Sequence, residues 1–354
     1  MSKFLNSRVK NLVPYTPGEQ PKDMKYIKLN TNESPFPPSK KAEKLTKKAV
    51  KKLNLYPDPE CKELTQKIAD MCGVKASNVI VTNGSDEILN FAFLAFASKK
   101  TKAVFPNITY GFYPVFAKIN GIPYEEIPLN EDFTINVNDY LGINKNIFIA
   151  NPNAPTGIML ELSEIEEIVK TNPDNLVVID EAYVDFGGES AISLIDKYDN
   201  LLVTQTFSKS RSMAGARIGF GVASEEIIKD LNTVRYSTNP YNINSMTMAA
   251  AIGVLEDEKY TEKNCAEIIK TRENTVKELK ALGFEVVNSV ANFVFAKHGK
   301  IGGEELYLKL KEKGVLVRHF GKEKIKDYNR ITIGTDEQMN ILVLKIKEIL
   351  EEMK

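Results

Sequence analysis

The segment NLVVIDEAYVDFGGESAISLIDKYDNLLVTQTFSKS, residues 175–210, contains the pattern that decides the fold. It holds two uninterrupted apolar runs, 176–179 and 201–203, and polar residues follow each run. A run of Val, Ile and Leu without polar alternation is typical of a strand that is buried on both faces. Such strands occur in parallel sheets with helices on both sides, so this segment predicts two strands of an α/β sheet.

Three further runs of the same kind precede this segment, at 79–81, 103–105 and 147–150, and helix-like segments separate them. This alternation of strand and helix predicts an α/β large domain over residues 30–254. We expect its sheet to be mainly parallel and to be flanked by helices.

After residue 255 the order of elements changes. A long helix over 262–282 is followed by a helix between short strands and by a closing helix; the strands are expected near 285–287, 292–295, 315–318 and 330–333. That order predicts a smaller α+β domain over residues 255–354, with an antiparallel sheet. Residues 1–29 lack a helical period and are rich in Pro and Tyr, which predicts an extended N-terminal arm that contributes to the small domain.

Composition narrows the classes of partner. The 354 residues carry 47 basic and 47 acidic side chains, and this balance argues against nucleic acid as the main partner. The three cysteines, Cys61, Cys72 and Cys265, have no C-x-x-C spacing and fit a reducing compartment. With only two histidines, His298 and His319, a histidine-rich metal centre is excluded, and we predict no metal site.

The N-terminal residues show no signal-peptide pattern, because they lack both an apolar core and a small-residue cleavage site. The longest apolar stretch, 91–97, is too short to cross a bilayer. We therefore predict a cytoplasmic protein that does not enter the membrane.

Polar and reactive residues follow four of the predicted strands. In open parallel sheets, ligands bind beyond the carboxyl ends of the strands, where loops meet helix N-termini. The segments at those ends are TNGSDE (82–87), NPNAPTG (151–157), DEAY (180–183) and TFSKSRSMAGAR (206–217). Each segment alone has an ordinary explanation as a turn or a helix cap. The chain lacks G-x-G-x-x-G, P-loop and G-x-S-x-G motifs, which disfavours a dehydrogenase, a P-loop NTPase and an α/β-hydrolase.

Together these segments supply what one cofactor, pyridoxal 5′-phosphate, requires. It needs a lysine for a Schiff base, a carboxylate at the ring nitrogen, an aromatic face, a donor to the ring hydroxyl and a phosphate cup. We assign these roles in turn to Lys209, Asp180, Tyr110, Tyr183 with Asn153, and the set Gly84, Ser85, Asp86, Ser208 and Arg217. In the cup, glycine permits close backbone approach, a helix begins with free amides, and arginine adds a charge-assisted contact.

With these residues in place, the chain resembles the fold type I pyridoxal-phosphate aminotransferases and, within them, the histidinol-phosphate aminotransferase family. The set from Gly84 to Arg217 carries the resemblance to the fold type. The segments PYTPG at 14–18 and LNTNESP at 29–35 point to the narrower family, and YPD at 56–58 and RITIGT at 330–335 also match.

The resemblance implies catalytic roles for Lys209, Asp180 and Tyr110: the covalent link to the cofactor, the partner of its ring nitrogen and the residue stacked on its ring. Tyr183 would bond the ring hydroxyl oxygen. Tyr56 would reach the cofactor phosphate of a neighbouring subunit, so the resemblance also implies a homodimer.

For the substrate, the resemblance implies that Arg330 binds a carboxylate or phosphate group. Tyr15, Asn32 and Arg318 would line the same pocket. The chain departs from the family at Ala154, because the family often has Asn directly before Pro-Thr-Gly. Alanine cannot donate a hydrogen bond, so Asn153 or Tyr183 must donate to the ring hydroxyl, or that bond is missing.

The implied reaction is transamination between histidinol phosphate and 2-oxoglutarate, which gives imidazole-acetol phosphate and glutamate in histidine biosynthesis. A threonine-phosphate decarboxylase and an aromatic amino-acid aminotransferase remain alternatives, since the cofactor residues would be the same. A non-catalytic ligand sensor is a third alternative, which the presence of Lys209 argues against.

Overall fold

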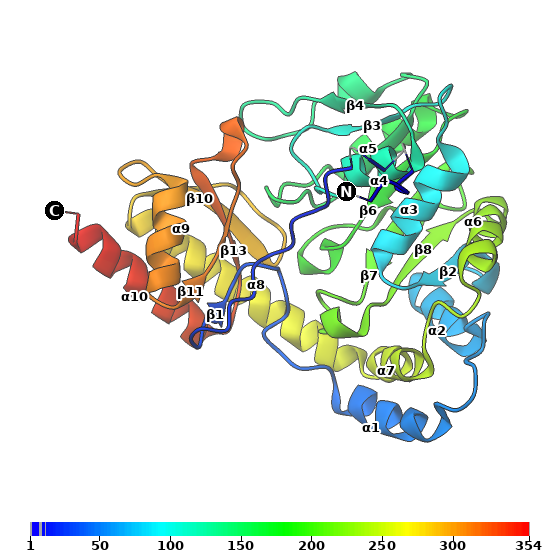
Figure 1. The fold of residues 1–354 in the computed structure, drawn as a ribbon, viewed down its shortest axis with the longest axis horizontal. Coiled ribbons are helices and arrows are strands. Elements are labelled where there is room, and N and C mark those ends of the chain that lie inside the picture. The colour runs from blue at the N-terminus through cyan, green and yellow to red at the C-terminus, as the bar shows by residue number, and fades with distance from the viewer. Residues whose placement is uncertain (1, 7–8, 11, 354) are drawn as a thin grey trace.

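The computed structural model describes residues 2–6, 9–10 and 12–353, and its largest element is a seven-stranded sheet (Figure 1). The strands lie in the order β2-β8-β7-β6-β5-β3-β4. Their bounds are β2 Val79–Thr82, β3 Ala103–Pro106, β4 Tyr124–Ile127, β5 Asn146–Ala150, β6 Val177–Asp180, β7 Leu201–Thr206 and β8 Gly219–Ala223. The pairs from β7 through β6, β5 and β3 to β4 are parallel, and β8 is antiparallel to both β2 and β7. The predicted, mainly parallel sheet is confirmed.

Both faces of this sheet are covered by helices, and alternate side chains of each strand pack on opposite faces. In β5, Ile147 and Ile149 join one hydrophobic cluster, whereas Phe148 and Ala150 join another. The first cluster includes side chains of α2 (Lys62–Cys72), α5 (Leu162–Thr171) and α7 (Ser245–Leu255). The second includes side chains of α3 (Ser85–Phe96), α4 (Tyr113–Asn120) and α6 (Glu225–Thr238). Burial on both faces explains why the strands have uninterrupted apolar sequences.

Two strands of the large sheet are not predicted by the sequence. The edge strand β4 reads Tyr-Glu-Glu-Ile, and its two glutamates are exposed. The buried strand β8 reads Gly-Phe-Gly-Val-Ala, and its glycines interrupt the apolar run. A Cβ atom on Gly219 would lie 2.5 Å from the backbone nitrogen of Ser85, so β8 needs glycine where α3 begins beside it.

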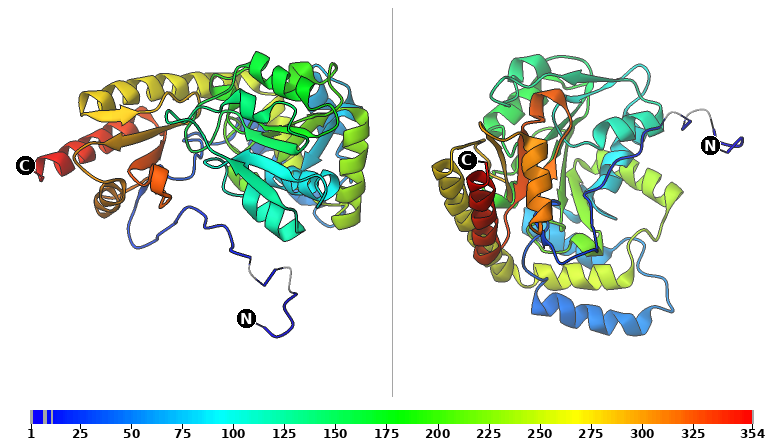
Figure 2. Two further views of the ribbon diagram at one scale, coloured as in Figure 1. Left: turned by 90° about the horizontal axis from the view of Figure 1, so that it is seen from above. Right: turned by 60° about the vertical axis from the view of Figure 1, so that its left-hand side comes forward.

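A second, four-stranded antiparallel sheet forms from the C-terminal part of the chain, in the order β12-β13-β10-β9. Its strands are β9 Phe284–Val286, β10 Phe293–His298, β12 Arg318–His319 and β13 Tyr328–Thr332. The helices packed with it are α8 Glu258–Ala281, α9 Gly303–Glu312 and α10 Asp336–Glu351. Figure 2 shows the long helix α8 running from the large sheet to the small one. The predicted smaller α+β unit is confirmed.

The N-terminal arm reaches the small sheet through a short strand, β1 (Ile27–Lys28), which pairs in parallel with β11 (Val315–Leu316). The backbone of Leu29 then bonds Leu316 and Thr332, at 2.8 and 2.9 Å. The chain next enters α1 (Lys40–Ala49), where the Ser39 side chain accepts a hydrogen bond from the Ala42 amide. After β1 the chain therefore runs from the small sheet to α1 (Figure 1).

Short 3-10 helices connect several of these elements; they are η1 Val50–Lys52, η2 Ala76–Asn78, η3 Val137–Tyr140, η4 Val184–Phe186, η5 Ala191–Leu194, η6 Ala214–Ala216 and η7 Glu323–Ile325. Within the described ranges, no helix is both long enough and apolar enough for a membrane span.

Candidate active site

A cavity of about 290 Å³ lies at the carboxyl ends of the central strands. The last residues of β5, β6 and β7, which are Ala150, Asp180 and Thr206, all line it. Eight of the predicted cofactor residues also face this space: Ser85, Asp86, Tyr110, Asp180, Tyr183, Ser208, Lys209 and Arg217. The structure thus brings together side chains that come from four separate loops.

The Asp180 carboxylate is buried in the wall of this cavity. The hydroxyl groups of Tyr113 and Thr204 donate to it, each at 3.2 Å. Burial, together with the nearby charge of Asp86, raises the pKa of Asp180 to about 7, although these hydrogen bonds act in the opposite direction. A cation placed in the cavity beside Asp180 would favour its charged form.

Lys209 lies in the loop after β7 and also lines the cavity. Its Nζ atom donates to the Thr31 carbonyl at 3.2 Å and lies 5.8 Å from the centre of the Tyr183 ring. The Tyr183 hydroxyl in turn accepts a hydrogen bond of 2.9 Å from the Asn32 side chain. A free amine and a fixed phenol therefore face the same space.

The start of α3 forms an anion cradle on another side of the cavity. Gly84 occupies the N-cap position at φ +80°, and no side chain caps the helix. Arg217 approaches from the opposite side, where its guanidinium lies 3.3 Å from Asp86 and 3.4 Å from the Ser208 hydroxyl. The positive φ of residue 84 favours glycine, and a Cβ atom there would lie 2.7 Å from the Arg217 guanidinium, which would have to shift. Uncapped helix amides and an arginine are the groups that bind phosphate in proteins.

Tyr110 closes the cradle side of the cavity. Its hydroxyl donates to the Asp86 carboxylate at 2.6 Å. Burial raises the pKa of Tyr110 well above that of a free tyrosine, and the charge of Asp86 adds to this effect. The phenol therefore remains protonated and acts as a hydrogen-bond donor.

Two arginines lie on adjacent strands of the small sheet, where Arg318 in β12 pairs with Arg330 in β13. Arg330 donates to the Asn30 carbonyl at 3.0 Å, and its buried Nε atom has no hydrogen-bond partner. Burial lowers the pKa of Arg330. Arg318 instead donates to the main-chain carbonyls of Thr16 and Pro17 in the arm, at 3.0 and 3.3 Å. The unpaired Arg330 donor is suited to an anionic ligand group.

Tyr15 and Asn32, the other two residues predicted for the substrate pocket, make internal contacts. The Tyr15 ring stacks on Phe112 with 4.2 Å between ring centres. Asn32 is buried, donates to Tyr183, and accepts a hydrogen bond of 3.1 Å from the Thr332 hydroxyl. Asn32 therefore positions Tyr183 rather than presenting a free amide to the cavity.

The structure does not bring Asn153 to the cavity. Its amide nitrogen donates to the Ile108 carbonyl and the Thr156 hydroxyl, and its oxygen accepts from Thr109. Ala154 lines the cavity instead. The family asparagine is thus replaced by a methyl group, and Tyr183 is the remaining predicted donor to a ring hydroxyl.

Tyr56 also lies away from this cavity. It is 82% exposed and stacks on Tyr241, with 4.5 Å between ring centres. In a single chain it therefore contributes nothing to the cradle around Gly84.

Sequence reasoning missed three groups that complete the site: the hydroxyls of Tyr113 and Thr204 and the Thr31 carbonyl. Tyr113 and Thr204 are fully buried within elements that read as core. Polar residues inside apolar segments are the one signal that marks them, since a buried hydroxyl needs a partner.

Comparisons with known proteins identify the family of this chain. The aminotransferase class I and II family matches residues 24–346. Histidinol-phosphate aminotransferase of Brachyspira hyodysenteriae is 51% identical over 99% of this chain and all of its own length. The same enzyme of Clostridium beijerinckii is 47% identical over 99% of this chain and 98% of its own.

Solved structures show the same fold. The crystal structure of the histidinol-phosphate aminotransferase from Clostridium acetobutylicum has a TM-score of 0.85 at 25% identity, over 92% of this chain and 99% of its own. That of the Sinorhizobium meliloti enzyme in complex with pyridoxal-5′-phosphate has a TM-score of 0.86 at 23% identity, over 93% of this chain and 92% of its own. From the family match and the full-length relatives, this chain belongs to the class I and II aminotransferases, in the family of the histidinol-phosphate aminotransferases.

Proposed function

We propose that this protein transfers the amino group of histidinol phosphate to 2-oxoglutarate, giving imidazole-acetol phosphate and glutamate in histidine biosynthesis. The observation that carries the proposal is that a chain 51% identical to a histidinol-phosphate aminotransferase places Lys209 and Asp180 in the wall of one cavity. The cofactor of this reaction is pyridoxal 5′-phosphate.

The residues of the cavity fit this cofactor. Asp180 is a buried carboxylate bonded only by neutral groups, and the protonated nitrogen of the pyridine ring would supply the opposite charge. The cradle of Gly84 and Arg217 suits a phosphate group, because it offers helix amides and a guanidinium. Lys209 supplies the amine for the covalent link.

The chain's own residues then have distinct roles. When bound, the cofactor supplies an electron sink for the bond that breaks at the substrate carbon. Lys209, once free, moves the proton at the substrate carbon that carries the nitrogen. Asp180 holds a proton on the ring nitrogen, and Tyr183, which Asn32 fixes, orients the ring. Pro17 and Gly18 of the arm line the cavity and exclude water from it.

Arg330 is expected to bind the anionic group of the substrate. Replacing Arg330 with glutamine removes a charge-assisted contact, so we expect the KM for histidinol phosphate to rise about 10- to 100-fold with a smaller change in kcat. Steady-state kinetics measure both constants. Lys297→Gln, on the adjacent strand β10 and paired with exposed Glu285, is the matched control. An unchanged KM in Arg330→Gln would exclude this role.

The substrate itself is tested by half-reactions of the purified holoenzyme. We expect cofactor absorbance to change faster with histidinol phosphate than with phenylalanine at equal concentration. Release of carbon dioxide from threonine phosphate, without amino transfer to 2-oxoglutarate, would favour the decarboxylase instead. A protein that binds no cofactor would favour the ligand sensor.

We also propose a homodimer in which Tyr56 completes the cradle of the partner. Its support is a group of exposed apolar side chains: Val50, Leu53 and Leu55 precede Tyr56 in the chain, and Tyr241 stacks on Tyr56. A second copy of the chain would cover such exposed aromatic and aliphatic side chains.

Subunit complementation tests this arrangement. Lys209→Ala and Tyr56→Ala are each expected to be nearly inactive, but a mixed dimer has one intact site. Random assembly from equal amounts should restore about one quarter of wild-type activity to the whole mixture, and the purified mixed dimer, with one of its two sites intact, should show about one half. Co-expression with two different tags and assay of the doubly tagged species provide the measurement. A mixed dimer no more active than its parents would disprove the shared site.

Two coarser features of the protein remain part of this proposal. The three cysteines are free in the structure, which supports a reducing, cytoplasmic location. We also propose the division into an arm (1–29), a large domain (30–254) and a small domain (255–354); the pairing of β1 with β11 supports the attachment of the arm to the small domain.

A further inference from the structure

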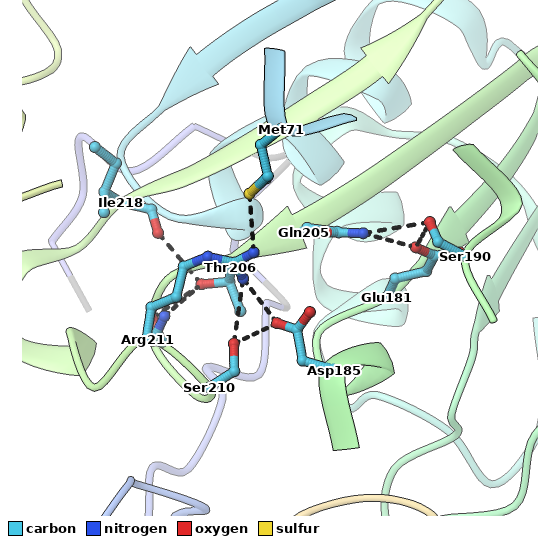
Figure 3. Close-up of polar contacts among 10 residues, drawn as sticks. Met71, Glu181, Asp185, Ser190, Gln205, Thr206, Ser210, Arg211 and Ile218 are labelled. Carbon is cyan, nitrogen blue, oxygen red and sulfur yellow. Dashed lines mark hydrogen bonds and ion pairs between the residues drawn. The ribbon is translucent and has the colours of Figure 1, made fainter. Parts of the chain in front are cut away.

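A second polar cluster lies beside the loop that carries Lys209. Its members are Asp185, Ser210 and Arg211. The Asp185 carboxylate accepts hydrogen bonds from the Ser210 hydroxyl and from the Arg211 guanidinium, the latter at 2.7 Å. Figure 3 shows these three side chains pointing toward one another. None of the three lines the cofactor cavity.

The Asp185 carboxylate joins two loops whose relative position matters for the proposed reaction. Asp185 lies in η4, two residues after Tyr183, and Ser210 directly follows Lys209. One carboxylate therefore ties the loop after β6, which carries Tyr183, to the loop after β7, which carries Lys209. Both Tyr183 and Lys209 face the cavity.

Arg211, the second partner of Asp185, is itself held by contacts with Phe207 and Met71. Its side chain is only 9% exposed, and its guanidinium lies 5.2 Å from the centre of the Phe207 ring. It also donates to the Met71 sulfur of α2 at 3.2 Å (Figure 3). A buried guanidinium needs a counter-charge, and Asp185 provides it.

The base and the tip of the Lys209 loop are held differently. At its base, the Phe207 amide bonds the Ile218 carbonyl, and the Met213 amide bonds the Phe207 carbonyl. At its tip, the side chains of Ser210 and Arg211 bond Asp185, and Ser212 bonds Ser34 at 2.8 Å. The Ser212 amide also bonds the Lys209 carbonyl at 3.2 Å. Loss of the Asp185 contacts would therefore loosen the tip of the loop beside Lys209 without detaching it.

We propose that Asp185, together with Arg211, is a positioning residue that holds the Lys209 amine in register with Tyr183. This inference rests on the proposed function. A misplacement of about 1 Å at a reacting group costs on the order of 100-fold in rate, so a small release of the loop is measurable. The effect belongs to kcat, because the substrate anion is bound elsewhere, at Arg330.

A cavity of about 450 Å³ lies beside the cluster and is lined by both Asp185 and Arg211. The charged groups that face it are Lys67 and Asp70 of α2 and Glu258 and Glu262 of α8, together with Asp185 and Arg211. Asp185→Asn removes one charge of the pair and keeps the shape of the side chain. Arg211→Gln removes the other charge and keeps a polar group, on a shorter side chain.

The test is a double-mutant cycle on the holoenzyme with Asp185→Asn, Arg211→Gln and the pair. We expect each single variant to lower kcat about 10- to 100-fold and to leave the KM for histidinol phosphate within about threefold. Because both act through one link, the double variant should be no slower than the slower single variant, within about threefold.

A spectroscopic readout separates positioning from simple loss of stability. We expect the midpoint of the pH titration of cofactor absorbance to fall by at least about half a pH unit in Asp185→Asn, because the uncompensated Arg211 charge disfavours a nearby cation. Glu166→Gln is the matched control. Like Asp185, Glu166 accepts hydrogen bonds from two side chains, here Lys197 and Tyr198. The exposed fractions of the two side chains are also similar, at 29% for Glu166 and 32% for Asp185. The Glu166→Gln variant should change neither kcat nor the midpoint.

A lower Tm in the Asp185 and Arg211 variants, with kcat and titration midpoint unchanged, would overturn the inference, as would fully additive losses in kcat. Wild-type protein that binds the cofactor but does not react with histidinol phosphate would overturn the proposed function alone. In that case the absorbance titration would still decide the role of Asp185.

Discussion

Replacing Lys209 with alanine is expected to lower kcat for amino transfer by at least about 1,000-fold, within the range that a positioned acid–base group contributes. The cavity-lining amine that can bond the cofactor and move the substrate proton is lost, and a methyl group cannot replace either function. The cradle at Gly84 and the Asp180 carboxylate remain, so the variant should still bind the cofactor without a covalent link.

Borohydride reduction followed by peptide mass analysis measures the link directly. We expect wild-type protein to carry the reduced cofactor on the peptide that contains Lys209 and the variant to carry none. Lys197→Ala, whose side chain is 63% exposed, is the matched control for loss of a lysine. A Lys209→Ala enzyme that turns over at the wild-type rate would refute the whole assignment.

Replacing Asp180 with asparagine is expected to have two opposite effects. It should lower kcat about 100- to 10,000-fold, because the neutral amide cannot hold a proton on the ring nitrogen. It should also stabilise the cofactor-free protein above pH 7, because the buried carboxylate that must ionise there is removed.

The sign of the stability change follows from the raised pKa of Asp180. The folded-state pKa is about 7 and the ordinary value is 3.8, so between these pH values the folded chain binds a proton that the unfolded chain has released. This group therefore makes the free energy of unfolding fall as pH rises from 3.8 through 7. The full loss is on the order of 4 kcal/mol above pH 7.

Urea unfolding of cofactor-free wild type and Asp180→Asn at pH 5 and pH 8 tests this claim. The stability difference between the two proteins should be larger at pH 8 than at pH 5. Glu181→Gln is the comparison variant for activity, because burial also raises the pKa of Glu181 to about 7, while its carboxylate bonds Ser190 and Gln205. An Asp180→Asn variant that keeps full activity would contradict the role at the ring nitrogen.

The sequence predicts those strands whose side chains are buried on both faces of the sheet. The runs 147–150 and 176–179 are buried on both faces, so their apolar character is continuous and β5 and β6 are predictable. β4 and β8 were missed because an edge strand tolerates glutamates, and because β8 carries glycines for close packing against α3. In those two strands, tertiary position decides the structure and local composition does not.

The same distinction applies to the site. The rule that ligands bind at strand ends brings Asp180, Ser208 and Lys209 together, because each follows a recognisable strand. The partner of Asn32 could not be predicted, since its bond to Tyr183 joins residues 151 positions apart. The position of Asn153 could not be predicted either, because a loop asparagine can face the cavity or bond a neighbouring loop, here at Ile108 and Thr109, and only the packed structure decides.

The hydrogen bonds from Arg318 to Thr16 and Pro17 have a practical consequence for the placement of an affinity tag. An affinity tag joined to the first residue would be attached to the arm, which Arg318 holds and whose residues Pro17 and Gly18 line the cavity. A tag placed after α10 would be attached to a helix that packs with the small sheet. A C-terminal tag is therefore preferable, because it is not attached to the segment that lines the cavity, and kinetic values from N-terminally tagged protein should be compared with those from tag-free protein.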